Sequence, residues 1–298
     1  MSELKRRIRG KIRQNRSEKF NLINEAVNTT SQIIAEHYES KRLFLSRKQL
    51  NSFKVLIMST ERDLSLAYLN SQQIIKIYPT QVAAVDIVTP VDMTIQGLDP
   101  RIRIVNERIF LGNKAINNAI SKFNERSGWI KQQYLKMKYV SNSELPVLIL
   151  DADTFLKQPI FLFDDQSHAL LIGTQDYHYP YTSHARNFYR KPQPLLNFVN
   201  HLQIQIPAVY KDIFPTDFDA QWIEWVSLGK VYGEDSAVSE FQTYAGQILN
   251  QIKYKPIITS LDHETINMEN MTSAEFIKYF ESYEGDLLTV GNKLLIKH

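Results

Sequence analysis

The sequence contains no cysteine among its 298 residues. Disulfide bonds, thiolate zinc sites and cysteine nucleophiles are therefore excluded, and any bound metal must be held by oxygen or imidazole ligands. No run of about 18 apolar residues is present, so we expect no membrane-spanning helix. The basic amino terminus is not followed by an apolar stretch, so we expect no secretory signal and a cytoplasmic protein.

Three glycine-dependent signatures are also missing: G-x-x-x-x-G-K-[ST], G-x-G-x-x-G and G-x-S-x-G. Their absence argues against P-loop NTPases, dinucleotide oxidoreductases and serine hydrolases of the α/β type. What is present is an ordinary globular composition, with 43% hydrophobic and 22% charged residues. The length fits one large α/β domain or two small ones, at roughly 100–200 residues per domain.

Positive charge is concentrated in the first fifty residues, whose net charge is +7 against +3 for the whole chain, which leaves −4 for the remainder. Leu4, Ile8 and Ile12 recur every four residues among basic side chains, which predicts a short amphipathic helix. Residues 1–19 could lie on an anionic membrane surface, form a solvated arm or pack against a neighbouring subunit. No nucleic-acid contact is expected, because no aromatic residues alternate with the basic ones.

A second helix is predicted over Phe20–Tyr38, and the character of the chain changes near residue 50. We therefore divide the chain into a basic helical segment, residues 1–48, and a main domain, residues 49–298.

The main domain begins with an alternation of strand and helix patterns. Phe53–Thr60 and Val82–Thr89 are rich in strand formers, and Leu64–Tyr78 between them has helical spacing. Strand, helix and strand within about forty residues indicate a βαβ unit, and hence a parallel sheet. Ligands bind at the carboxyl ends of such strands, which here are Ser59–Asp63 and Thr89–Asp92.

Further elements are predicted along the rest of the chain. The strands are Ile102–Val105, Pro146–Leu150, Ala169–Gly173 and Ile257–Leu261, and the helices are Ala115–Phe123, Gly128–Val140, Pro194–His201, Ser236–Ile252 and Ser273–Tyr283. Asp176–Pro194 is rich in aromatic residues, histidine and proline, and we expect an irregular segment that faces a ligand. The predicted fold class is α/β, with a mainly parallel central sheet flanked by helices.

Asp151 and Asp153 directly follow the apolar strand that ends at Leu150. In an extended backbone residues i and i+2 point to the same side, so both carboxylates can converge on one point. Two carboxylates that converge in this way repel each other unless a cation or a shared proton lies between them. Mg²⁺ or Mn²⁺ suits oxygen ligands and usually also binds substrate phosphates. The alternative is a pair of solvated aspartates that simply end a strand.

Four segments carry a resemblance to a known family. Leu148–Thr154 resembles the DxD segment of GT-A glycosyltransferases, and Ser59–Asp63 after its strand resembles the nucleotide-contacting start of that fold. Trp129-x-x-Gln132-Gln133-x-x-Lys136 and Ser239-Glu240-Phe241-x-x-Tyr244 are similar to segments of a little-characterised bacterial set of predicted glycosyltransferases. The resemblance covers roughly residues 53–265 and implies a Rossmann-like GT-A fold, a divalent metal, and sugar transfer from a nucleotide-sugar, with a UDP-sugar first among the candidates.

The resemblance also implies roles for single residues. Asp153 would be the direct metal ligand, and Asp151 would contact the ribose or a metal-bound water. His263 is a candidate further metal ligand, with His178 as a competing source. The remaining donor contacts would be Thr60, Glu61, Arg62, Asp63, Gln132, Gln133 and Lys136. The alternative for the last three is that Trp129 is buried in the core and its polar helix neighbours are solvated.

An inverting transferase also needs a carboxylate that removes a proton from the acceptor hydroxyl. Glu240 is the first candidate for this catalytic base, and Asp235 or Glu234 the second. Acidic residues are also common at helix amino termini, because they complement the helix dipole, so simple capping is the alternative.

These observations predict a metal-dependent glycosyltransferase that uses a glycan or lipid-linked acceptor in bacterial capsule, O-antigen or lipooligosaccharide synthesis. Residues 1–19 would place it at the inner face of the cytoplasmic membrane. One alternative is a sugar nucleotidyltransferase, although Ser59–Asp63 lacks the glycine-rich loop of that class. The other is a non-catalytic scaffold with a degenerate GT-A fold, which would tolerate Asp153→Asn.

Overall fold

The computed structural model describes residues 52–93, 98–160, 162–163, 168–173, 178–189, 198, 201–231, 235, 237–251, 253–259, 261–267 and 273–291. The helices predicted within residues 1–48 lie outside the described residues, and so does most of the helix predicted over Pro194–His201.

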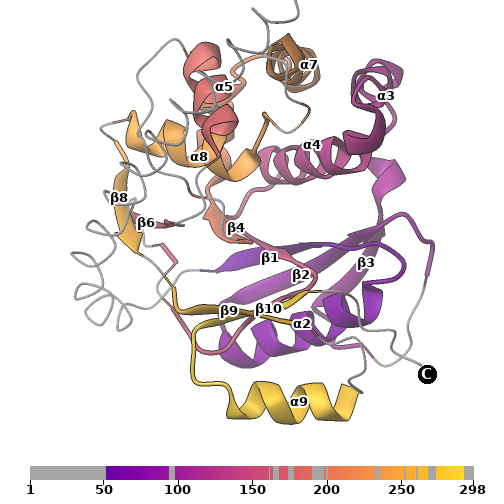
Figure 1. Ribbon diagram of the computed structural model, residues 1–298, viewed down its shortest axis with the longest axis vertical. Coiled ribbons are helices and arrows are strands. Elements are labelled where there is room, and N and C mark those ends of the chain that lie inside the picture. The colour runs from indigo at the N-terminus through magenta and orange to yellow at the C-terminus, as the bar shows by residue number, and fades with distance from the viewer. Residues whose placement is uncertain are drawn as a thin grey trace, which may run out of the picture.

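A five-stranded sheet forms the centre of the described part of the chain (Figure 1). Its strands, in order across the sheet, are β3 (Ile102–Asn106), β2 (Val82–Thr89), β1 (Phe53–Met58), β4 (Val147–Asp151) and β7 (Leu202–Gln205). Neighbours are parallel from β3 to β4, and β7 is antiparallel to β4. Strands covered on both faces are near-continuous apolar runs, which is why the sequence revealed β1, β2 and β4. The predicted mainly parallel α/β sheet is confirmed.

Alternate residues of β1 face two separate cores. Val55 and Ile57 pack on the side of α2 (Leu64–Ile77), whereas Leu56 packs on the side of the other large helices. Figure 1 shows α2 below the sheet and α3, α4, α7 and α8, which belong to this second group, above it. The second group comprises α3 (Lys114–Ser121), α4 (Ser127–Ser141), α6 (Pro207–Ile213), α7 (Phe218–Val231) and α8 (Glu240–Leu249). Short 3-10 turns, η1 (Glu107–Ile109) and η2 (Asn124–Arg126), lead into α3 and α4.

Two smaller sheets complete the described strands. One has the order β5 (Thr154–Leu156), β10 (Leu287–Gly291) and β9 (His263–Asn267), and the other pairs β6 (His168–Ile172) with β8 (Lys255–Thr259). Helix α9 (Ser273–Ser282) packs on β5, where the ring centroids of Phe276 and Phe155 lie 4.9 Å apart. No helix in the described ranges has both the length and the apolar character that crossing a membrane requires.

The prediction of an irregular segment at Asp176–Pro194 was wrong for α5 (Tyr179–Tyr189). Pro180 lies in the first turn of this helix, where a proline removes no intrahelical hydrogen bond. The buried side chains of Thr182 and His184 fix the helix to the core, and the ring of His184 lies edge-on to Trp225 of α7. Helix α8 is also shorter than predicted. It begins at Glu240, because the Ser239 Oγ accepts a hydrogen bond from the Gln242 backbone and caps it.

His184 should make folding stability depend on pH. Burial lowers its pKa to about 4, and its Nε2 lies 2.6 Å from the carbonyl of Trp225. Below pH 6.5 the unfolded chain binds a proton that the folded protein binds only near pH 4, so stability is full above pH 6.5 and falls by about 3 kcal/mol by pH 4. Urea unfolding at pH 7 and pH 4.5 should show a smaller loss for His184→Gln than for the wild type. Equal losses in the two proteins would contradict the assignment.

Candidate active site

The predicted ligand-binding loop lies beside the aspartate pair at the carboxyl edge of the large sheet. Asp151 ends β4 in register with Met58, the last residue of β1. The loop Ser59–Asp63 follows directly from there, with Thr60 and Arg62 exposed. Within it the Thr60 Oγ1 donates to the Asp63 carboxylate at 2.7 Å, and the Arg62 Nε donates to it at 3.2 Å. Parallel strands thus bring the loop and the aspartates to one edge, as the sequence predicted.

Asp151 has two side-chain partners, Lys136 and His201. Its Oδ1 accepts a hydrogen bond from the Lys136 Nζ, and its Oδ2 lies within hydrogen-bonding distance of the His201 Nδ1, both at 2.9 Å. Burial favours the neutral acid, but the charge of Lys136 and the bond to His201 outweigh it and hold the pKa of Asp151 well below its usual range. The same bond raises the pKa of His201. The side chain of Asp151 still exposes 28% of its surface, so it is open to a ligand on one side.

Lys136 joins Asp151 to Glu240. Its Nζ lies 2.8 Å from the Glu240 Oε1 and above the ring of Phe241. Lys136 is 4% exposed and Glu240 is 2% exposed. Burial disfavours the ammonium charge, but the carboxylates of Asp151 and Glu240 outweigh this effect and keep the pKa of Lys136 above its ordinary value. Lys136 and Glu240 are therefore a buried ion pair that joins α4 to α8, and Lys136 links this pair to the end of β4.

Gln133 binds the same helix end. Its Oε1 accepts a hydrogen bond from the Glu240 backbone N–H at 2.8 Å, so it satisfies a donor at the start of α8. Gln133 and Lys136, which we predicted to reach the donor, instead bind within the protein, because their helix face is covered by α8. Gln132, one position away, is half-buried, and its predicted contact with the donor stays a prediction. Three of the four segments quoted from the sequence therefore meet in one network.

Asp153 lies in the turn between β4 and β5. Its backbone carbonyl accepts from the Val290 N–H at 2.9 Å, and its Oδ1 accepts from the Thr154 Oγ1 at 3.3 Å. Asn70 on α2 fixes the turn from below, because its Nδ2 donates to the carbonyls of Asp151 and Thr154. Burial and the negative charge of Asp151 together raise the pKa of Asp153. Among the described residues, the Asp153 carboxylate therefore lacks a positive partner that would offset its burial and the nearby charge of Asp151. A cation bound there would supply that partner.

His201 was not given a role by sequence reasoning, although the structure places it against Asp151. Its backbone is left-handed, with φ 53°, a conformation in which histidine is several times more frequent than most residues. The four residues of β7 that follow it are too short to stand out as a strand, so nothing in the sequence placed His201 beside β4. The backbone pairing of Asp151 N–H with the His201 carbonyl at 3.0 Å extends that strand pair by one step.

His263 approaches the aspartate turn from β9. Its Nε2 lies 2.9 Å from the Thr289 Oγ1, which in turn lies 3.1 Å from the Thr154 Oγ1. The ring centroids of His263 and His201 are 6.0 Å apart. His263 is thus near the turn that holds Asp153, on the small sheet rather than the large one. Asp235, the second candidate base, is exposed.

The chemistry of the aspartate turn is compatible with a divalent cation, for which Asp153 stays the predicted ligand. Across the described ranges, no group of three or more His, Asp or Glu side chains is arranged as a metal cage. Mg²⁺ is usually bound by one or two carboxylates together with waters and substrate phosphates, so such a cage is not required. The Asp151 Oδ1 already accepts from the Lys136 Nζ, and its Oδ2 lies 2.9 Å from the His201 Nδ1, which leaves the Asp153 carboxylate as the better candidate ligand.

No protein-family model and no curated protein matches the sequence. Among solved structures, the galactosyltransferase LgtC with donor and acceptor sugar analogues aligns over 80% of this chain and 86% of its own, at 12% identity and a TM-score of 0.43. The mannosyltransferase Ktr4p from S. cerevisiae with GDP aligns over 78% and 79%, at 8% identity and a TM-score of 0.40. The glycosyltransferase GlyE of Streptococcus pneumoniae TIGR4 aligns over 80% and 54%, at 9% identity and a TM-score of 0.36. TM-scores below 0.5 do not establish a function, so the function must be inferred from the site.

Proposed function

We propose that the protein is a GT-A glycosyltransferase that moves a sugar from a nucleotide-sugar, with a UDP-sugar as the first candidate, to an acceptor hydroxyl. The observation that carries this proposal is the placement of Asp153 two residues after Asp151, which is paired with Lys136, at the carboxyl edge of a mainly parallel sheet. Ligands of open α/β sheets bind at this edge. A divalent cation is commonly bound by a protein carboxylate and by substrate phosphates together, so the Asp153 carboxylate suits a ligand that carries a diphosphate.

The chain's own residues would divide the work. Asp153 would hold Mn²⁺ or Mg²⁺, and the metal would neutralise the charge of the departing nucleoside diphosphate. Asp151 would accept a hydrogen bond from the ribose or from a water, since an ionised carboxylate has about four acceptor positions and two are occupied. Residues 60–63 would lie against the nucleoside. His263, close to the turn, is the candidate for a further contact with the metal or the diphosphate.

The catalytic base is assigned differently from the first expectation. Glu240 is buried and paired with Lys136, so its carboxylate has no open path to an acceptor hydroxyl. We propose that Glu240 positions Lys136, and through it Asp151. Asp235 is exposed and is the carboxylate that we keep as the candidate base of an inverting transfer.

Thermal unfolding against a panel of nucleotides and nucleotide-sugars, with and without Mn²⁺, tests the proposal. A ligand at about a hundred times its Kd should add roughly 2.7 kcal/mol of stability. A Mn²⁺-dependent shift with one nucleotide, followed by release of its nucleoside diphosphate, would support sugar transfer. Release of pyrophosphate instead would support the nucleotidyltransferase, and no shift with any nucleotide would support the scaffold.

The acceptor class and the membrane contact are separate proposals, motivated by the eight Lys/Arg residues in residues 1–19. Basic residues near an anionic surface contribute on the order of 1 kcal/mol each. The full-length protein should therefore float with anionic vesicles, and a truncation lacking residues 1–19 should float at least tenfold less. Such binding would fit a lipid-linked acceptor of bacterial surface polysaccharide synthesis. Equal flotation of the two proteins would refute the membrane contact.

A further inference from the structure

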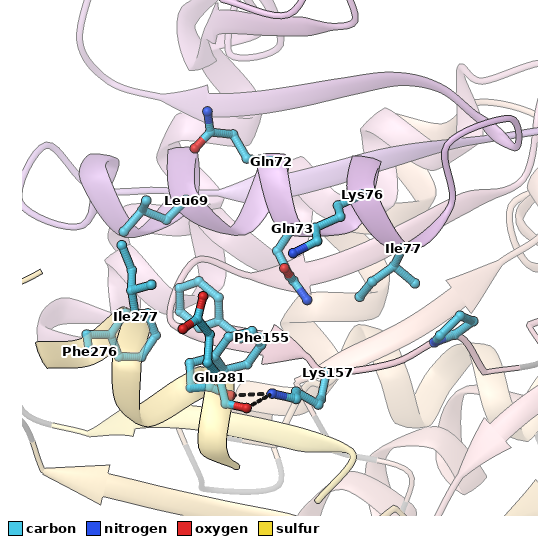
Figure 2. A pocket seen from close by; sticks show the side chains of 12 residues that line it. Leu69, Gln72, Gln73, Lys76, Ile77, Phe155, Lys157, Phe276, Ile277 and Glu281 are labelled. Atoms are coloured by element: carbon cyan, nitrogen blue, oxygen red, sulfur yellow. Dashed lines mark hydrogen bonds between the residues drawn. The ribbon is translucent and has the colours of Figure 1, made fainter. Parts of the chain in front are cut away.

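A groove of about 490 Å³ separates α2 from α9, away from the aspartate site (Figure 2). Its apolar lining comes from both helices and from β5: Leu69, Ile77, Phe155, Phe276, Ile277 and Phe280. Gln72, Gln73 and Lys76 of α2 and Lys157 after β5 add polar groups. Figure 2 shows Lys157 bound to the end of α9, where its Nζ donates to the carbonyls of Phe280 and Glu281. None of these residues takes part in the site described above.

The groove leaves apolar surface uncovered. Ile277 is 44% exposed. Few large hydrophobic side chains in the described part of the chain are as exposed to solvent. Beneath it the ring centroids of Phe155 and Phe280 lie 5.7 Å apart, so the floor is aromatic and firmly packed. A preformed apolar floor with an exposed isoleucine at its wall is suited to the apolar face of a helix.

The first described residues, Ser52 and Phe53, lie beside the carboxyl end of α2, which lines one end of this groove. The Phe53 N–H donates to the carbonyl of Gln81, and the Phe53 ring packs edge-on against Tyr78, with centroids 5.4 Å apart. Tyr78 directly follows Ile77, which lines the groove at the carboxyl end of α2. Ser52 is therefore a point close to the groove from which residues 20–38 must be reached. The thirteen residues between Tyr38 and Ser52 can span roughly 40 Å, about twice the ~21 Å length of a helix of fourteen residues such as α2.

Residues 20–38 have the pattern and the charge that this groove requires. Their apolar residues are separated by four and eleven positions, so they share one helix face: Leu22, Ile23, Ala26, Val27, Ile33 and Ile34. Their only Lys, Arg, Asp or Glu residues are Glu25 and Glu36, whereas residues 1–19 carry eight Lys/Arg and two Glu. The lining of the groove carries Lys76, Lys157 and Glu281, a net positive charge. Charge therefore favours residues 20–38 over residues 1–19 as the occupant.

We propose that residues 20–38 dock in cis into the groove between α2 and α9, with their apolar face on Phe155, Phe276 and Ile277. Docking buries the exposed isoleucine and pairs an acidic segment with Lys76. It leaves the basic residues 1–19 outside the groove. The proposal does not depend on the chemistry at Asp153.

Hydrogen exchange of the full-length protein tests the docking. Amides of residues 20–38 should exchange at least tenfold more slowly in the wild type than in Ile277→Glu, because a buried carboxylate without a partner would expel the segment. Ile109→Glu is the matched control, since Ile109 is 69% exposed and is not part of the groove, and it should exchange like the wild type. Unprotected amides in the wild type, or protection that survives Ile277→Glu, would overturn the proposal. A cooperative thermal unfolding transition in both variants establishes that the fold is intact.

A second experiment identifies the occupant, and the absence of native cysteine makes it direct. Ile277→Cys is combined in turn with Leu22→Cys, Val27→Cys or Ile34→Cys in the full-length chain, and each protein is oxidised. A disulfide within a monomer in at least one combination supports docking in cis. Disulfides formed only between two chains would assign the groove to a second copy, and no disulfide in any combination would leave the segment elsewhere. Both of these results would overturn the proposal.

Discussion

Lys136→Met is expected to destabilise the folded protein by about 3–5 kcal/mol, as is typical when one partner of a buried ion pair is removed. Methionine is an apolar side chain of nearly the same length. It leaves the Glu240 carboxylate, which is 2% exposed, without its cationic partner. It also removes one of the two bonds that hold Asp151. Urea unfolding, with the slope compared between variants, measures the change.

Two variants test whether the loss comes from the stranded charge. Lys136→Met combined with Glu240→Gln should recover more than half of the lost stability, because the uncompensated carboxylate is gone. Lys138→Met on the same helix removes a partly exposed ion pair with Asp219. Asp219 keeps its hydrogen bonds from Tyr134 and Asn113, so this variant should lose about 1 kcal/mol of stability or less. A loss for Lys136→Met no larger than that of Lys138→Met would show that the bridge contributes little.

Asp153→Asn should have opposite effects on the free and the ligand-bound protein. The side chain keeps its size and can still accept from Thr154, but it loses the charge that Asp151 repels. Because the pKa of Asp153 is raised, its ionised form is disfavoured by folding, so the ligand-free variant should be at least as stable as the wild type at pH 7. The Mn²⁺-dependent stabilisation by a nucleotide-sugar should disappear, and turnover should fall by roughly a hundredfold or more.

Glu224→Gln is the control for a general loss of negative charge. Glu224 is an exposed residue of α7 and takes no part in the site described above. Thermal unfolding and product assays should leave this variant close to the wild type. If Asp153→Asn retained the metal-dependent shift, Asp153 would not be a metal ligand, and the scaffold alternative would gain support.

The sequence predicted those strands and helices whose pattern of apolar residues can be recognised within the segment itself. β1, β2 and β4 are apolar runs long enough to be distinguished, and Asp151 and Asp153 follow the last of them. α7 was missed because Trp222, Trp225 and Val226 are buried on a helix with little polar contrast between its faces. β5 has three residues and β7 has four, too few for a pattern of alternation.

The candidate site was predicted in its position but not in its contacts. Glu240 and Lys136 are 104 positions apart, and no local pattern states that one will be buried against the other. Lys136 on an otherwise mixed helix looks like a solvated residue that could reach a phosphate. Only the packing of α8 onto α4 removes it from water and turns it toward the two carboxylates.

The two aspartates lie where two sheets meet, with Asp151 at the end of β4 and Asp153 in the turn directly before β5. Ala152 is the single residue between them, and Asn70 binds the backbone on both sides of the turn. A rotation of the small sheet against the large one would therefore change the separation of the two carboxylates directly. The spacing of the charges depends on how the two sheets pack, so a substitution at their contact far from either aspartate is expected to alter cation affinity.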